Sequence, residues 1–215
     1  GLVCPLEALL AHLGDGDWAL LEETLSLGSV GPLGRGLASG RGQSDSTATV
    51  LVAAGLGHAF CGGGAILAGP ADWMVRIRSQ SLGYQAPDPL PVHALALALA
   101  GLEFMMANGE EPLQRLWYKD RYFRMGLKSC GFPLVGESPH VCLAFPPNPR
   151  SQAFFQALQA EAPYLGKRVA EARGAQTPPT AWQLRLTVTA KHTQADMDSA
   201  IERLAAMGRA SGVLD

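Results

Sequence analysis

Lysine is scarce in this sequence and absent from its first half. The chain has 215 residues, and its lysines are Lys119, Lys128, Lys167 and Lys191. A Schiff base between a protein and an aldehyde needs a primary amine, which among side chains only lysine supplies. Residues 1–118 therefore cannot provide a lysine for Schiff-base chemistry.

Cysteine and charge are also low. The cysteines at 4, 61, 130 and 142 are widely spaced and form no CxxC pair, which predicts reduced thiols in a cytosol-facing protein. Charged residues make up 17% of the chain and its net charge is −2, so no polybasic surface for nucleic acid or membrane is indicated. The histidines have no metal-ligand spacing, and no metal site is predicted.

A long uncharged membrane segment is missing as well. The longest apolar stretch, around residues 91–106, contains His93 and Glu103 and favours a packed helix over a membrane span. No signal peptide is visible, and the chain opens on Gly1 rather than Met. We expect it to be a fragment of a longer protein.

Glycine, by contrast, is concentrated in the stretch GLGHAFCGGGAILAGP, residues 55–70. STATVLVAA before it predicts a buried strand, and AILAG at 65–69 predicts a second one. Gly62, Gly63 and Gly64 between them permit close approach by a ligand or another chain, and His58 lies just before that turn. The pattern alone favours a tightly packed turn without chemistry.

A second glycine-rich segment surrounds Arg35, with glycines at 28, 31, 34 and 36. It lacks GxxxxGK[ST], and no GxGxxG follows a strand, so a phosphate-binding loop is excluded. We expect a turn whose conformation is determined by its glycine backbone and which packs against a partner subunit.

Hydrophobic spacing predicts the remaining elements. Helices are predicted at 5–12, 72–81, 91–108, 111–130, 152–160 and 194–210, and strands at 18–23, 134–135, 141–145, 168–172 and 183–189. Gly109 is predicted to cap the end of one helix, and Thr193 the start of the last one, with Asp196 in its first turn.

Several motifs in order resemble the α-oxoamine synthases, pyridoxal-phosphate enzymes of fold-type I that condense an amino acid with an acyl-CoA and release carbon dioxide. They are GLVCPL at 1–6, LLEETLSLGSVGPLGRG at 20–36, GLGHAFCGGGAILAG at 55–69, LVGES at 134–138 and LRLTVTAKHT at 184–193. Over nearly the whole chain, the sequence is similar to the branch that lacks the cofactor lysine, the first long-chain-base subunit of serine palmitoyltransferase. This implies a C-terminal half, with an N-terminal membrane anchor and further cofactor fold upstream of Gly1.

The resemblance implies an α/β fold like that of aspartate aminotransferase. Residues 1–90 would complete the large domain of a fold-type I pyridoxal-phosphate transferase. Residues 91–215 would form a linking helix and the small α+β C-terminal domain, with a short antiparallel sheet covered by helices.

The resemblance also assigns the cofactor-side positions. His58 falls on the lysine that carries the cofactor; imidazole cannot form an aldimine, so no catalytic residue is expected on this chain. Glu22 falls on the aspartate that pairs with the pyridine nitrogen in catalytic relatives, and Leu25 on their histidine. Because Glu is longer and would crowd the ring, a strand-end carboxylate facing solvent or a helix N-terminus is favoured for Glu22.

Other positions concern substrate and interface. Arg185 falls on the arginine that binds the substrate carboxylate, although a structural ion pair or a partner contact fits it equally well. Pro87, Asp88 and Pro89 replace hydroxyl-bearing residues that reach the neighbouring subunit's cofactor phosphate in active relatives; a carboxylate there would repel phosphate. The interface residues implied are Gly62, Gly63, Gly64, Tyr84 and Asp88, and a buried structural role is an equal alternative for Tyr84.

The function implied is that of a non-catalytic subunit of serine palmitoyltransferase, which condenses L-serine with palmitoyl-CoA to 3-ketosphinganine in sphingolipid biosynthesis. The lysine-bearing second long-chain-base subunit would hold pyridoxal phosphate covalently, in a heterodimer on the cytosolic face of the endoplasmic reticulum membrane. This chain would stabilise the pair and shape its site, and would be inactive alone.

Two alternatives stay open. One is a self-sufficient synthase of the 8-amino-7-oxononanoate synthase or glycine C-acetyltransferase type, against which the absence of lysine before Lys119 argues. The other is a pseudoenzyme scaffold outside sphingolipid synthesis, an alternative that the unusual sequence Pro87-Asp88-Pro89 keeps open.

Overall fold

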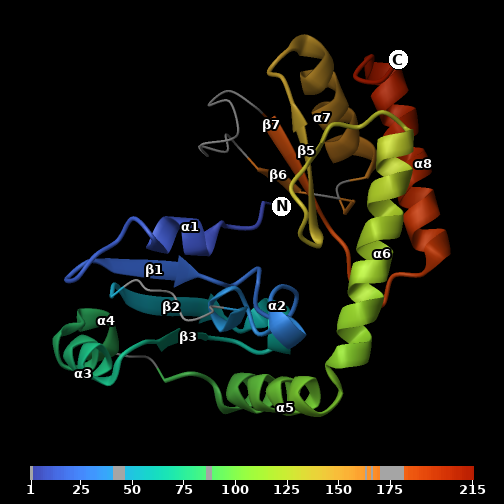
Figure 1. Ribbon diagram of the computed structural model, residues 1–215. Helices are drawn as coiled ribbons and strands as arrows, with labels where there is room; N and C mark the ends of the chain where they lie inside the picture. The colour runs from blue at the N-terminus through green and yellow to red at the C-terminus, as the bar shows by residue number, and fades with distance from the viewer. Residues whose placement is uncertain (1, 41–46, 86–88, 163, 166, 170–181) are drawn as a thin grey trace. The chain divides into compact units, whose positions relative to one another are not determined.

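The computed structural model describes residues 2–40, 47–85, 89–162, 164–165, 167–169 and 182–215, which fall into two compact units (Figure 1). The N-terminal unit comprises Cys4–Leu113, and the C-terminal unit comprises Gln114–Asp215 together with the residues up to Val3. The domain boundary expected near residue 90 stays a prediction, because these units follow only from contacts within this chain.

The N-terminal unit is built on a three-stranded sheet in the order β1-β2-β3. Strands β1 (Trp18–Glu22) and β2 (Thr49–Gly55) are parallel, with Glu22 opposite Ala53. Strand β3 (Ala65–Ala68) returns antiparallel to β2, so that Gly55 lies opposite Ala65. The three strands predicted in this part of the sequence are confirmed, and the carboxyl ends of β1 and β2 meet at one edge.

Helices surround this sheet. They are α1 (Leu6–Leu10), α2 (Gly57–Phe60), α3 (Ala71–Gln80), α4 (Leu82–Gln85) and α5 (Val92–Asn108), with short 3₁₀ turns at Pro32–Gly34 and Ala38–Gly40. The helix following β3 and the long helix α5 are confirmed. Gly109 caps α5 as predicted, and its amide donates to the carbonyl of Met105 at 3.0 Å. Helices α2 and α4 were not anticipated.

The C-terminal unit contains an antiparallel sheet in the order β4-β5-β7-β6. Its strands are β4 (Leu134–Val135), β5 (His140–Phe145), β6 (Lys167–Val169) and β7 (Trp182–Thr187). Its helices are α6 (Glu110–Ser129), of which the part from Gln114 belongs here, α7 (Pro149–Glu161) and α8 (Gln194–Ser211). The predicted short antiparallel sheet with helices packed on it is therefore confirmed (Figure 1).

Aromatic side chains fill the core between that sheet and its helices. The rings of Phe145 and Phe154 lie 5.2 Å apart, and Phe155 meets both edge-on at 5.7 Å. Leu184 and Leu204 are fully buried beside them. Alternate residues of β7 point inward, so Leu184 and Leu186 are buried while Arg185 between them is not.

Hydrogen bonds in the first turn of α8 stabilise the start of this helix. Thr193 and Asp196 form a capping box: the Thr193 hydroxyl accepts from the Asp196 amide at 3.1 Å, and Asp196 Oδ2 accepts from the Thr193 amide at 2.7 Å. The Thr193 hydroxyl also donates to Asp196 Oδ2 at 2.7 Å, and the bonds that this carboxylate accepts from the Thr193 amide and hydroxyl lower its pKa, the bond from the amide contributing most. The predicted N-cap at Thr193 is confirmed.

Among the described residues, no single helix is both long and apolar enough to cross a bilayer. Helices α5 and α6 taken together reach that length and apolar composition, but with a bend between them.

Candidate functional site

The carboxyl ends of β1 and β2 are joined through one threonine. The Thr24 hydroxyl accepts a hydrogen bond from the Gly55 amide at 2.8 Å and donates to Glu22 Oε1. The Thr24 amide also donates to Glu22 Oε1, at 3.1 Å. Glu22 is exposed at the end of β1, and half of its acceptor capacity is thus used by its own chain.

His58 lies on α2, the helical turn that follows β2 directly. Phe60 and Leu56 are buried and anchor this turn, while His58 is exposed. Cys61 ends the turn in the left-handed conformation with φ of 56°. The result is an imidazole held on a short, anchored turn beyond the edge where β1 and β2 end.

The three consecutive glycines bring α5 against this turn. A β-carbon at Gly62 would lie 2.5 Å from the β-carbon of Ala98, and one at Gly63 would lie 3.0 Å from that of Ala94. One at Gly64 would lie 2.7 Å from Leu90 Cδ1. The close approach that these glycines permit is therefore made by residues of the same chain, as a tightly packed turn requires. Their expected part in a subunit interface stays a prediction.

Tyr84 lies on α4 and is 54% exposed, so the alternative of a buried structural tyrosine is wrong. The guanidinium carbon of Arg78 lies 5.9 Å from the centre of its ring, within the range of a cation–π contact. Asp88 and Pro87 lie outside the described residues, while Pro89 is exposed. An interface role for Tyr84 and Asp88 stays a prediction.

Glu23 was not anticipated as a functional residue from the sequence. Its side chain is only 2% exposed, and its two carboxylate oxygens accept from the Leu37 amide at 2.6 Å, the Ala38 amide at 2.7 Å and the Ser26 hydroxyl at 2.6 Å. In the fold β1 alternates in exposure, so the residue after Glu22 falls on the inward side, but the strand is apolar on both faces and its sequence carries no signal of this. Of two adjacent glutamates, the unassigned one is the buried one.

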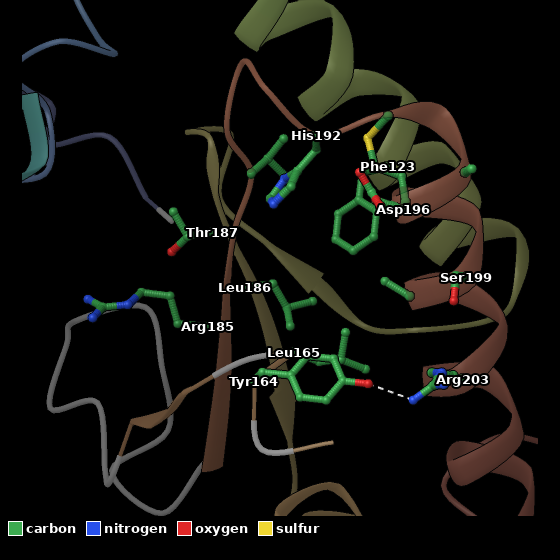
Figure 2. A pocket seen from close by; sticks show the side chains of 14 residues that line it. Phe123, Tyr164, Leu165, Arg185, Leu186, Thr187, His192, Asp196, Ser199 and Arg203 are labelled. Carbon is green, nitrogen blue, oxygen red and sulfur yellow. Dashed lines mark hydrogen bonds between the residues drawn. The ribbon is translucent and has the colours of Figure 1, made fainter. Parts of the chain in front are cut away.

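In the C-terminal unit, Arg185 borders an open groove of about 850 Å³ between β7 and α8 (Figure 2). Apolar side chains, among them Phe123, Leu165 and Leu186, line its inner part. Figure 2 shows the Arg185 guanidinium pointing away from α8. Within the described ranges Arg185 has no ion-pair partner, so the structural ion pair considered from the sequence is not found there.

Polar groups sit at the two ends of this groove. At one end, His192 Nδ1 accepts from the Thr189 amide at 3.2 Å, which fixes the turn before α8. At the other end, Arg203 Nη1 donates to the Tyr164 hydroxyl at 2.6 Å (Figure 2). The groove offers guanidinium groups for an anion, but no nucleophile paired with a base is seen among its described lining residues.

No metal centre is assembled in the described part of the chain: no three His, Cys, Asp or Glu side chains there converge on one point. Each unit thus carries candidate functional groups of its own. The N-terminal unit presents a carboxylate and an imidazole beyond the strand ends, and the C-terminal unit presents arginine beside an apolar groove.

Comparison with known proteins found one matching family. The profile described as aminotransferase class I and II matches residues 28–204. Serine palmitoyltransferase from Sphingomonas paucimobilis is 28% identical over all of this chain and 50% of its own length. The 8-amino-7-oxononanoate synthase of Halorhodospira halophila is 31% identical over 97% of this chain and 52% of its own. The chain spans about half the length of the curated relatives it matches.

Solved structures agree with these relatives. A serine palmitoyltransferase variant from S. paucimobilis with a bound pyridoxal phosphate–myriocin aldimine superimposes with a TM-score of 0.81 at 26% identity, over 99% of this chain and 53% of its own. The 8-amino-7-oxononanoate synthase of Francisella tularensis gives a TM-score of 0.68 at 20% identity over 90% of this chain and 55% of its own, a likeness in fold alone. The expected aminotransferase-like fold is confirmed.

Proposed function

The chain belongs to the aminotransferase class I and II family, and we propose that within it the chain is a non-catalytic, lysine-lacking subunit of serine palmitoyltransferase. Its relatives are serine palmitoyltransferases and 8-amino-7-oxononanoate synthases, which places it among proteins related to pyridoxal-phosphate acyltransferases. The pairing partner would be the lysine-bearing second long-chain-base subunit.

One observation carries this proposal: no lysine precedes Lys119 in the sequence, and the motif resemblance aligns His58 with the position of the family's cofactor lysine. Pyridoxal phosphate, when bound, supplies an electron sink for bond cleavage next to an amine. The described residues do not fit its covalent attachment, because α2 offers an imidazole and no primary amine. We therefore assign covalent attachment of the cofactor to the partner and no chemical step to His58.

The rest of the local geometry fits a structural role at a shared site. Glu22 accepts two hydrogen bonds from Thr24, so a large part of its capacity to pair with a cofactor nitrogen is already used. Leu25 falls on the family's histidine position by the same resemblance, and its side chain has no atom that donates or accepts a hydrogen bond. The anchored turn α2, packed on α5, supplies a rigid wall. Arg185 would contact serine or the partner, and the pair would act on serine and palmitoyl-CoA at the cytosolic face of the endoplasmic reticulum membrane.

A self-sufficient synthase is the main rival, since 8-amino-7-oxononanoate synthases are about equally similar. It needs an amine that the first 118 residues lack. A scaffold outside sphingolipid synthesis would keep the fold and lose the partner.

The proposal is tested by co-expressing the chain with a lysine-bearing serine palmitoyltransferase subunit and purifying the pair. We expect the two to co-purify, with an internal-aldimine absorption band and condensation of serine with palmitoyl-CoA that the chain alone lacks. The band in the isolated chain would favour the self-sufficient synthase. Failure to associate, or full activity of the lysine-bearing subunit without this chain, would favour the scaffold.

A further inference from the structure

The glycine loop, defined as residues 28–38, is fixed from inside by one carboxylate. Glu23 is buried, and it accepts from the amides of Leu37 and Ala38 at the end of the loop and from Ser26 before its start. A β-carbon added at Gly36 would collide with Glu23 Oε2. The Glu23 carboxylate therefore packs directly against the loop backbone, and no side chain can be accommodated at Gly36.

The loop is also closed across its own base. The Gly28 amide donates to the Gly34 carbonyl at 2.7 Å, and the Gly36 amide donates to the Val30 carbonyl at 2.9 Å. Leu27 and Arg35 form an antiparallel bridge. These backbone hydrogen bonds, together with those that Glu23 accepts, hold the loop backbone in one conformation.

That path is strained at one residue. Gly28, Gly31, Gly34 and Gly36 all have positive φ, as glycine allows, but so does Leu33, with φ of 52° and ψ of 27°. A left-handed conformation is unfavourable for a residue with a branched apolar side chain and persists only where its surroundings enforce it. Such strain is characteristic of binding segments rather than of passive turns.

The loop exposes the side chains of Pro32, Leu33 and Arg35, and the last two are the larger ones. Leu33 is 56% exposed and Arg35 is exposed, while Gly34 and Gly36 on either side of Arg35 are buried. Within the described part of the chain, the Arg35 guanidinium has no hydrogen-bond or ion-pair partner. A rigid turn thus holds an aliphatic side chain and an arginine in water, two kinds of group suited to a protein contact.

The loop touches the turn that carries His58. A β-carbon at Gly28 would lie 2.9 Å from that of Ala59, so loop and α2 are in direct contact. A chain that packs against α2 would therefore meet the loop as well.

We propose that the glycine loop is a preformed contact surface for the lysine-bearing partner subunit, with Leu33 and Arg35 as the contacting side chains and Glu23 as the residue that fixes them. This inference rests on the proposed function. The complementary surface is an apolar depression beside a carboxylate, because Leu33 needs burial and Arg35 needs an anion. A small anionic ligand is disfavoured, because both groups project from a turn and the ligand would have to bring its own pocket.

The contact is tested by measuring the affinity between the two purified subunits. Leu33→Asp and Arg35→Glu should each weaken association about tenfold or more, and Arg35→Lys should weaken it less. Leu9→Asp is the matched control, because Leu9 is a similarly exposed leucine, 52% against 56%, on α1. It should leave the affinity unchanged.

Leu33→Gly separates contact from folding. Glycine adopts the left-handed conformation without strain, so the thermal midpoint of the isolated chain should stay the same or rise. Affinity for the partner should nevertheless fall, because the side chain is gone. Unchanged affinity in Leu33→Gly would show that the leucine makes no contact.

Glu23→Gln tests the fixing role. Both oxygens of Glu23 accept from donors, so either orientation of a glutamine amide places its NH₂ against one of them. Hydrogen exchange at the Leu37 and Ala38 amides should accelerate, and partner affinity should fall. Glu7→Gln, at an exposed glutamate on α1, is the control and should change neither.

The outcomes are distinguishable. If the unaltered subunits do not associate, the proposed function is overturned and this inference falls with it. If they associate and the Leu33 and Arg35 variants bind as tightly as the control, the loop is not the contact surface, while the proposed function stands.

Discussion

Within the C-terminal unit, Arg124 Nε donates hydrogen bonds to both carboxylate oxygens of Asp120, at 3.0 Å to Oδ1 and 2.9 Å to Oδ2. The same guanidinium donates to the carbonyl of Gly136 at 2.7 Å and to that of Ser138. Asp120 is only 1% exposed, so α6 and the turn between β4 and β5 are joined through a buried charge pair. Burial raises the pKa of Asp120, and Arg124 opposes that rise.

Arg124→Met should destabilise the chain by about 3–5 kcal/mol at neutral pH, since it leaves the Asp120 carboxylate buried without its cation. Loss of Arg124 raises the pKa of Asp120 further, so the folded variant holds its proton more tightly than the unfolded chain does. The protonated Asp120 carboxyl therefore stabilises the folded variant fully below about pH 3.8. This contribution is lost as the pH rises through the pKa of Asp120 in the folded variant. Urea unfolding from acid to neutral pH should therefore show a penalty that grows with pH, and a constant penalty would contradict this account.

Thr193→Ala should lower the free energy of unfolding by about 1 kcal/mol, because the capping hydroxyl of α8 is lost. The pKa of Asp196 is lowered in the fold, so its contribution is present above about pH 3.8 and lost as pH falls through the lowered value. Asp196→Asn should therefore flatten the acid side of the stability profile measured by chemical denaturation. Ser199→Ala, one turn further along α8, serves as the control and should have little effect.

Gly62→Ala should cost roughly 1–3 kcal/mol, because the new methyl group would overlap Ala98 on α5. Gly83→Ala is the matched change: the nearest atom to its new β-carbon lies 3.8 Å away, so the variant should be as stable as the parent or slightly more stable. Thermal unfolding of both variants checks this. If Gly62→Ala and Gly83→Ala had equal thermal midpoints, close packing of α5 against the glycine turn would be contradicted.

His58→Lys should give the chain a covalent cofactor adduct. We expect an aldimine absorption band after addition of pyridoxal phosphate, made permanent by borohydride, and no condensation activity, because Leu25 and Glu22 remain. His93→Lys on α5 is the control for non-specific adducts. A band of equal strength in the unaltered chain would contradict the assignment of the cofactor to the partner.

The strands and long helices could be predicted because each has an uninterrupted periodic pattern. The segment 49–55 consists largely of small and β-branched residues, and α8 has both its capping residue and its apolar spacing. Helix α2 could not be predicted in this way. Its four residues begin with Gly57 and have little helical preference, and the burial of Phe60 stabilises the turn.

The candidate site was predictable in its residue types more than in its contacts. Glu22, His58 and Arg185 were identified from position within motifs, but hydrogen bonds made by Thr24 with Glu22 and Gly55 depend on how two strand ends align. The buried role of Glu23 was missed because β1 has apolar residues on both faces, so its pattern does not say which face is inward. Contacts between distant segments, such as Gly62 with Ala98, leave no local signal.

The pleat at the end of β1 has a consequence for interpreting variants of this chain. Glu22 and Glu23 are chemically identical neighbours, yet one lies in water and the other lies under the glycine loop. In a saturation library, position 22 should accept many amino acids, whereas position 23 should accept almost none. A substitution score based on residue type alone would give both positions the same tolerance to substitution, and it would be wrong for one of them.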